Sequence, residues 1–154
     1  SDFPFFTSIP QQAHRFAADV RTVAAAADAG VAVAAKDVSM AGSLGSLAML
    51  LEFTRHGCEI DLAAMPTPAD TDFVRWLIAF PSFAFWLTAD VDTADDCIEL
   101  FARADLTCAA VGTVSAGSAV VLRAAGEQAV LIDLATESVT GLWDRDGGAS
   151  DTGE

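Results

Sequence analysis

Basic residues are scarce in this sequence of 154 residues. Eight Lys and Arg side chains stand against 22 Asp and Glu side chains, which gives a formal net charge of −14. Lys36 is the only lysine. Binding to nucleic acid without sequence preference needs Lys and Arg side chains that neutralise phosphates, and binding to an anionic membrane surface has the same need. The composition therefore argues against both kinds of partner.

Long apolar runs are also missing. None reaches the roughly 20 residues that a membrane-spanning helix needs, and the nearest candidate, residues 20–35, is interrupted by Arg21, Asp28 and Gly30. The first ten residues have neither the basic start nor the apolar centre of a signal peptide. We therefore expect a cytoplasmic protein with no membrane partner.

Cysteine and histidine are too few, and too far apart, for the commonest metal and disulfide patterns. Cys58, Cys97 and Cys108 form no CxxC pair, and an odd number at irregular spacing is a poor disulfide framework. His14 and His56 belong to no HxxxH pattern, so no metal site is predicted. Cys97 lies in a helical pattern and Cys108 in a strand pattern, which predicts buried, unreactive thiols.

Apolar residues are abundant, at 53% of the chain, which is typical of a packed globular domain. We expect one domain over residues 1–142 and a disordered acidic tail over residues 143–154. Apolar periodicity predicts helices at 11–29, 44–56, 68–80 and from Thr93 onward, and strands at 31–35, 59–62, 83–88, 107–114, 119–122 and 129–134. This order predicts an α+β fold, a layered α/β sandwich in which helices cover a mixed sheet.

Turns and caps add detail to this expectation. The separators SAGS at 115–118 and AAGEQ at 124–128 read as hairpin turns, and residues 83–114 as one strand–helix–strand unit with a right-handed crossover. Thr67 is expected to cap a helix that has Pro68 at its first position. Thr93, with Asp96 three residues later, resembles a capping box.

The segment KDVSMAGSLG, residues 36–45, joins a predicted strand to a predicted helix. The free N–H groups and the dipole of a helix N-terminus favour an anion, and small residues let a ligand approach the backbone closely. Asp37 or Ser39 could cap the helix, and Asp37 could instead contact a metal ion carried with a phosphate. A plain strand–turn–helix junction explains the same residues.

The residues DVSMAGSLGSL, 37–47, resemble the aspartate, hydroxyl and glycine loop that opens the C-terminal domain of the aminoimidazole ribonucleotide (AIR) synthetase superfamily. In the loop they are most similar to selenophosphate synthetases. GCEIDLAAMP at 57–66 resembles the segment that follows the same helix in thiamine-monophosphate kinases, and AAVGTVSAGSAVVL at 109–122 resembles a strand pair of the superfamily. The resemblance runs from about residue 24 to residue 134, in the order and spacing of the superfamily, and implies an AIR synthetase C-terminal-domain-like fold.

This resemblance implies a phosphate- or substrate-binding loop made of Lys36, Asp37, Ser39, Gly42 and Gly45, with the catalytic residues unassigned. It implies ATP and Mg²⁺ for the full-length proteins. Nothing before Asp37 resembles the N-terminal ATP-binding domain of the superfamily, so we expect an excised or C-terminal domain that binds nucleotide weakly and has no turnover alone. Its implied partners are its own N-terminal ATP-binding domain and, in a homodimer, a second copy.

A non-catalytic ligand-binding or association module that retains the fold is the alternative. Many aromatic residues fall in a short span, at Trp76, Phe80, Phe83, Phe85 and Trp86. Packing in the core is the simpler explanation of these aromatics. An interface exposed by the missing domain is the other.

Overall fold

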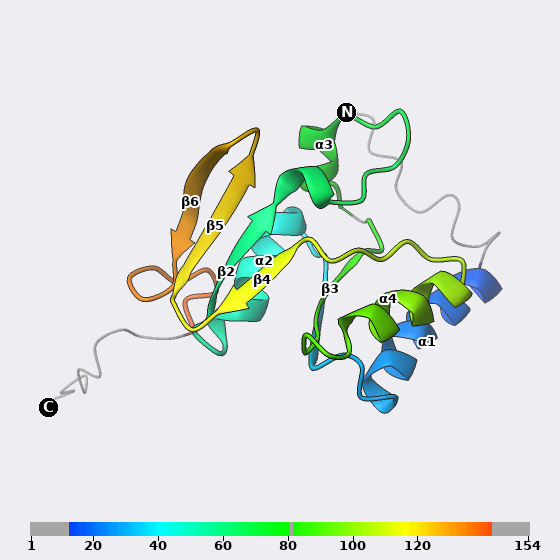
Figure 1. Ribbon diagram of the computed structural model, residues 1–154. Coiled ribbons are helices and arrows are strands. Elements are labelled where there is room, and N and C mark those ends of the chain that lie inside the picture. The colour runs from blue at the N-terminus through cyan, green and yellow to red at the C-terminus, as the bar shows by residue number, and fades with distance from the viewer. Residues whose placement is uncertain (1–12, 81, 143–154) are drawn as a thin grey trace, which may run out of the picture.

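The computed structural model describes residues 13–80 and 82–142 (Figure 1). The expected disordered tail, 143–154, lies outside the described residues. The helices are α1 (Ala13–Asp28), α2 (Gly42–Glu52), the short 3-10 helix η1 (Leu62–Ala64), α3 (Phe73–Leu77) and α4 (Ala94–Arg103). The strands are β1 (Ala34–Asp37), β2 (Gly57–Asp61), β3 (Phe85–Thr88), β4 (Gly112–Ser115), β5 (Ala119–Ala124) and β6 (Glu127–Asp133).

The strands form two sheets. The larger has the order β4-β2-β5-β6, in which β2 runs parallel to β5 while β2–β4 and β5–β6 are antiparallel. The smaller is the antiparallel pair β1–β3, in which Lys36 lies opposite Trp86. The expected α+β architecture with a mixed sheet is confirmed.

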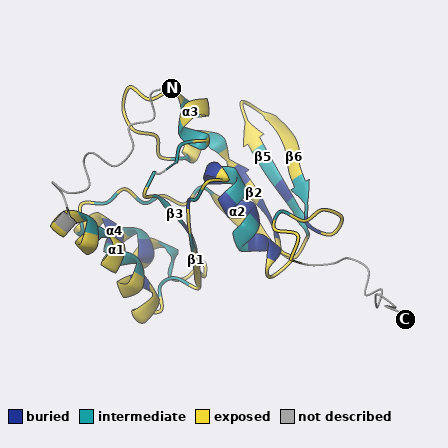
Figure 2. Ribbon diagram, turned by 180° about the vertical axis from the view of Figure 1, so that it is seen from behind, coloured by how far each residue is buried: buried dark blue, intermediate teal, exposed yellow. Residues whose placement is uncertain are grey.

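Helix α2 covers one face of the larger sheet, as the view from behind shows (Figure 2). Its Leu47 and Leu51 pack with Cys58 and Ile60 of β2 and with Val120 of β5, which is fully buried. These residues follow the two periodicities that the sequence shows, every three or four residues on the helix and every second residue on the strand. The main core therefore lies directly beneath the segment that joins β1 to α2.

Helices α1 and α4 pack against each other on the other side of the β1–β3 pair (Figure 1). Ala26, Cys97 and Phe101 form a second, smaller core there. One face of α1 is left open, since Val20 is 40% exposed and Ala27 is exposed, although their spacing predicts burial. The second core joins Ala26 of α1 to α4 and to Leu87 of β3, so only one narrow stripe of α1 is covered.

Two predictions about strand connections are wrong. SAGS does not close a hairpin, because β2 lies between β4 and β5; the N–H of Gly57 donates to the carbonyl of Gly117, which fixes the start of β2 across this loop. Residues 83–114 are not a strand–helix–strand unit of one sheet, since β3 and β4 belong to different sheets. The β5–β6 hairpin is confirmed, with Ala125 and Gly126 both at positive φ, as a type I′ turn requires.

Two predicted helix caps are also wrong. Helix α3 begins at Phe73, where Asp72 Oδ1 accepts from the N–H of Arg75 at 2.9 Å, so neither Thr67 nor Pro68 starts it. Thr93 precedes α4 but makes no side-chain cap, because its φ of −115° and ψ of −2° place it outside the extended region that a capping side chain needs. The first strand was predicted about three residues too early, because the amides of residues 31 and 32 close α1 by bonding to the carbonyl of Ala26.

Candidate functional site

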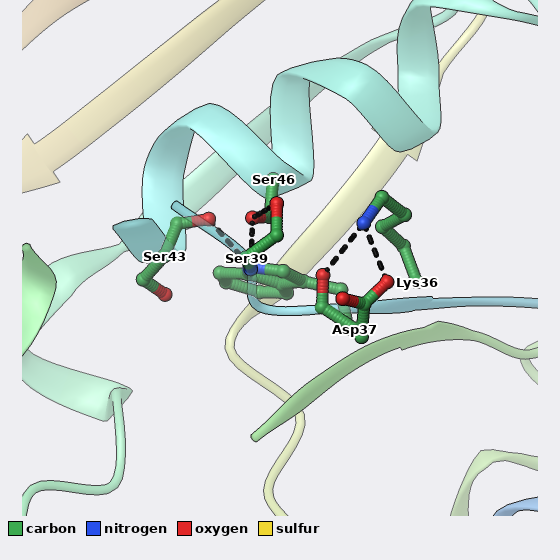
Figure 3. Close-up of polar contacts among 6 residues, drawn as sticks. Lys36, Asp37, Ser39, Ser43 and Ser46 are labelled. Atoms are coloured by element: carbon green, nitrogen blue, oxygen red, sulfur yellow. Dashed lines mark hydrogen bonds and ion pairs between the residues drawn. The ribbon is translucent and has the colours of Figure 1, made fainter. Parts of the chain in front are cut away.

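The loop predicted to bind a ligand lies between β1, which ends at Asp37, and α2, which begins at Gly42. The N–H of Val38 donates to the carbonyl of Ala84 at 2.9 Å and holds the start of the loop against the chain that leads into β3. Figure 3 shows Lys36, Asp37, Ser39, Ser43 and Ser46 around this junction. The structure therefore brings Lys36, Asp37, Ser39, Gly42 and Gly45 to one place.

The one lysine of the chain is engaged within the loop. Lys36 Nζ lies 2.6 Å from Asp37 Oδ1 and 2.9 Å from the carbonyl oxygen of Asp37 (Figure 3). The side chain of Asp37 is 60% exposed and that of Lys36 is 27% exposed. The two side chains compensate each other, so together they bring no net charge to the junction.

Two serines hold the loop onto the helix. The N–H of Ser39 donates to Ser46 Oγ at 2.9 Å, and the two hydroxyl oxygens lie 3.4 Å apart (Figure 3). Ser46 is fully buried, so this bond satisfies a polar group that water does not reach. Ser39 thus bonds to the second turn of α2 and does not cap its start.

Trp86 supports the junction from β3. Its indole N–H donates to the carbonyl oxygen of Ser43 at 2.7 Å, and the residue is 9% exposed. This bond joins the first turn of α2 to the smaller sheet. It satisfies a tryptophan N–H that burial would otherwise leave without a partner.

Both glycines are needed for close packing. Gly42 has a φ of +70°, and a Cβ there would lie 2.7 Å from the carbonyl oxygen of Leu77 and 3.1 Å from the Cα of Ile78. A Cβ at Gly45 would lie 2.6 Å from the Cβ of Ala41. Gly42 therefore lets the end of α3 approach the start of α2, and Gly45 leaves room for the side chain of Ala41.

The N-terminus of α2 is left without a side-chain cap. Ala41 occupies the N-cap position, is exposed and makes no side-chain hydrogen bond to the helix, so the expectation that Asp37 or Ser39 caps it is wrong. The amides of Ser43 and Leu44 have no carbonyl partner within the helix, as at the start of every helix. Open N–H groups, the positive end of the helix dipole and small side chains suit an anionic group.

Exposed apolar side chains lie on the loop and on α3, the elements that meet the start of α2. Met40 is 83% exposed, and Ile78, whose Cα lies next to Gly42, is 70% exposed. Val74, one turn earlier in the chain, is 64% exposed. We call Met40, Val74 and Ile78 the apolar rim of the loop.

Sequence reasoning missed Ser43, Ser46 and Trp86. Ser46 lies in the quoted motif, but its bond to Ser39 spans seven residues across a loop and a helix turn, which no local periodicity predicts. Trp86 was noted only as one of several aromatics. Its pairing opposite Lys36 was the missing information, and strand pairing is not readable from a single strand.

A second polar cluster lies at the far end of α2. Glu52 is 4% exposed; its Oε1 accepts from Ser138 Oγ at 2.5 Å and from the N–H of Val139 at 2.9 Å, and its Oε2 accepts from the N–H of Thr140 at 3.1 Å. Burial acts to raise the pKa of Glu52, but these hydrogen bonds outweigh it and hold the pKa below its usual value. Glu52 therefore anchors the segment that follows β6.

Within residues 13–80 and 82–142, no three His, Cys, Asp or Glu side chains gather as a metal site would require. In the same part of the chain, no helix combines the length and the apolar character that crossing a membrane needs.

The sequence matches the family described as AIR synthase related protein, C-terminal domain, over residues 10–125. It is 35% identical over 109 residues to the uncharacterized protein sll0787 of Synechocystis sp., covering 71% of this chain and 34% of that protein. It is 29% identical over 106 residues to the uncharacterized protein MJ0640 of Methanocaldococcus jannaschii, covering 69% of this chain and 33% of that protein. The chain thus spans about a third of the length of these relatives.

Solved structures show the same fold. PurL of T. maritima, complexed with ATP, superimposes with a TM-score of 0.65 at 14% identity, over 75% of this chain and 20% of that one. Phosphoribosylformylglycinamidine synthase II from Thermotoga maritima gives a TM-score of 0.60 at 14% identity, over 77% of this chain and 20% of its own. The expected family resemblance and fold are both confirmed: the chain belongs to the AIR synthase related proteins and carries their C-terminal domain.

Proposed function

We propose that this chain is the C-terminal domain of an ATP-dependent enzyme, and that residues 36–45 form a binding loop for a phosphate-bearing substrate or nucleotide. One observation carries the proposal: the N-terminus of α2 has no side-chain cap, and the residues at the helix start, Ala41, Gly42 and Ser43, have small side chains. The N–H groups of Ser43 and Leu44 would donate to the phosphate oxygens. Similarity to PurL, which was solved with ATP, supports the choice of ligand class.

Asp37 fits the role of a Mg²⁺ ligand. Mg²⁺ is usually held by one or two carboxylates together with substrate phosphates and water. The carboxylate of Asp37 is exposed, and only its Oδ1 is engaged by Lys36. An Mg²⁺ carried with a nucleotide would neutralise phosphate charge beside the helix end, and Lys36, released from Asp37, would then be free to meet a phosphate.

The affinity of this chain alone should be low. A helix N-terminus contributes about 0.3–2 kcal/mol toward an anion, whereas a dissociation constant of 1 mM already needs about 4 kcal/mol. The Lys36–Asp37 pair adds no net positive charge, and the chain as a whole carries −14. Phosphoryl transfer depends on positioning and charge neutralisation, so the missing part of the site would come from an N-terminal ATP-binding domain.

Calorimetric titration with ATP and Mg²⁺, together with an ATPase assay, tests whether this chain alone binds nucleotide weakly and has no turnover. We expect a dissociation constant no tighter than millimolar, and no turnover. Micromolar affinity or ATPase activity of this chain would contradict the proposal, because the loop would then not need a second domain.

The apolar rim favours the second candidate, an association module. Three exposed apolar side chains beside a ligand loop suit burial against another protein surface, either the chain's own ATP-binding domain or a second copy in a homodimer. Sedimentation velocity distinguishes the two: a second copy predicts concentration-dependent dimers that Ile78→Asp abolishes. A monomer at all concentrations would count against a second copy as the occupant and would weaken the proposal of an association surface.

A further inference from the structure

Two of the three cysteines share the smaller core. Cys97 lies on α4, is 4% exposed and packs with Ala26 and Phe101. Cys108 lies in the extended segment after α4, is half-buried and packs against the same cluster. Cys58 lies in the other core, beneath α2.

The path of the chain brings the two thiols together. Helix α4 ends at Arg103, and Asp105, with a φ of +59°, reverses the chain. The N–H of Leu106 then donates to the carbonyl of Phe101 at 3.0 Å, so the following residues run back along the helix. Cys108 packs against the cluster that contains Cys97, and each of the two thiols affects the pKa of the other.

The two thiols differ in access. Burial raises the pKa of both, and the neighbouring sulfur raises that of Cys108 further, so each is mainly protonated at neutral pH. Cys108 keeps part of its surface exposed, whereas Cys97 is only 4% exposed. A reagent should therefore meet Cys108 first and Cys97 only through Cys108.

We propose that Cys97 and Cys108 form a redox-active dithiol, which a low-molecular-weight disulfide such as glutathione disulfide oxidises to an intramolecular disulfide. The thiolate of Cys108 attacks one sulfur of glutathione disulfide, forms a mixed disulfide and releases one glutathione thiolate. Cys97 then loses its proton and attacks the Cys108 sulfur, which releases the second glutathione. Two cysteine thiols are oxidised, and one glutathione disulfide is reduced to two glutathione molecules.

The crosslink would join α4 to the segment that leads into β4. It would close a short loop and restrict the unfolded chain, which stabilises the folded state. The α1–α4 core would thereby be tied to the larger sheet by a covalent bond as well as by packing. We expect oxidation to raise the melting temperature by about 5–10 °C, reversibly on addition of a thiol.

Tryptic mapping tests the pairing directly, because Arg75, Arg103 and Arg123 place the three cysteines on different peptides. The chain is equilibrated with glutathione disulfide, alkylated and digested. We expect peptide 76–103 joined to peptide 104–123, with Cys58 alkylated on peptide 56–75. Separate, alkylated peptides for Cys97 and Cys108, or crosslinks that involve Cys58 at equal yield, would overturn the proposal.

Single variants test the order of the two steps. Cys97→Ser should trap glutathione on Cys108 as a stable mixed disulfide, while Cys108→Ser should leave Cys97 unmodified over the same time. Circular dichroism of each variant confirms that it is folded, and Cys58→Ala is the control that should still form the crosslink. Equally rapid modification of Cys97 in Cys108→Ser would contradict the roles assigned to the two thiols.

Discussion

Replacing Glu52 with Gln should weaken the attachment of the chain that follows β6. The carboxylate is buried and accepts hydrogen bonds from Ser138, Val139 and Thr140. A Gln of the same shape keeps one acceptor oxygen but turns an NH₂ group toward a donor. One buried donor is then left without an acceptor, and the remaining bonds lose the strength that the charge gave them.

The expected loss follows from these contacts. A buried donor without a partner costs about 1–3 kcal/mol, and bonds to a charged group are roughly twice as strong as neutral ones. We expect Glu52→Gln to lower the free energy of unfolding by about 2–3 kcal/mol, or the melting temperature by about 4–12 °C. Glu59→Gln is the matched control: its ion pair with Arg123 is half exposed, so its removal should cost at most about 1 kcal/mol.

Urea unfolding followed by tryptophan fluorescence measures both variants, and its pH dependence adds a second check. The pKa of Glu52 is lower in the folded chain than the usual 4.5, so its contribution is present above about pH 4.5 and is lost as the pH falls through the lower folded-state pKa. The difference in free energy of unfolding between the wild-type chain and Glu52→Gln should therefore be constant around neutral pH and become smaller in acid. A loss in free energy of unfolding below about 0.5 kcal/mol at pH 7, or a loss equal to that caused by Glu59→Gln, would refute this role of Glu52.

Three further tests of the fold use chemical denaturation. Gly42→Ala should lower the free energy of unfolding by about 2–4 kcal/mol, because its Cβ would meet the carbonyl of Leu77 and its φ is positive. The control is Gly30→Ala, which has the same φ but no atom within 4 Å of the added Cβ, and which should lower it by only about 1 kcal/mol. Equal losses in the two variants would contradict the steric argument. Trp86→Phe should lower the free energy of unfolding by about 2–4 kcal/mol, since it removes the hydrogen bond to the Ser43 carbonyl and leaves a void. An unchanged denaturation midpoint would contradict this role of Trp86. Ala125→Asn should instead stabilise the β5–β6 hairpin by about 0.5–1 kcal/mol, because Asn tolerates positive φ better than Ala, and a loss would show that the turn type is wrong.

The helices were predictable because their signals are local. Apolar periodicity at residues 44–56 predicted α2, and the structure places its Leu47 and Leu51 in the main core. The hairpin of β5 and β6 was predictable for the same reason, since Gly126 lies in a short turn between two apolar strands. The residues that specify a helix or a tight turn lie close together in the sequence.

The partition into two sheets was not predictable, because it depends on contacts between distant segments. Gly57 and Gly117 are 60 positions apart, yet their backbone bond fixes where β2 enters the larger sheet. Loop lengths and turn residues around SAGS favoured a hairpin, and tertiary packing overrode them.

The candidate site was located by its motif, but its internal bonding was not. The resemblance implied that Lys36 and Asp37 belong to a ligand loop, and the fold adds that they pair with each other. Ser39 was considered as a cap, whereas it is held by Ser46. A motif gives the residue types at a site, and only the fold gives the partners.

The most direct test of the proposed binding loop is an NMR titration of the backbone amides with inorganic phosphate. Ala41→Asp places a negative charge at the open end of α2, while Ala41→Asn offers a side-chain cap of the same shape without the charge. We predict that phosphate shifts the amide signals of Ser43 and Leu44 in the wild-type chain, with a dissociation constant in the millimolar range or weaker, and that Ala41→Asp loses this response more completely than Ala41→Asn. If phosphate leaves these amides unchanged, or if Ala41→Asp responds like the wild type, the start of α2 is a structural junction and not a phosphate-binding site.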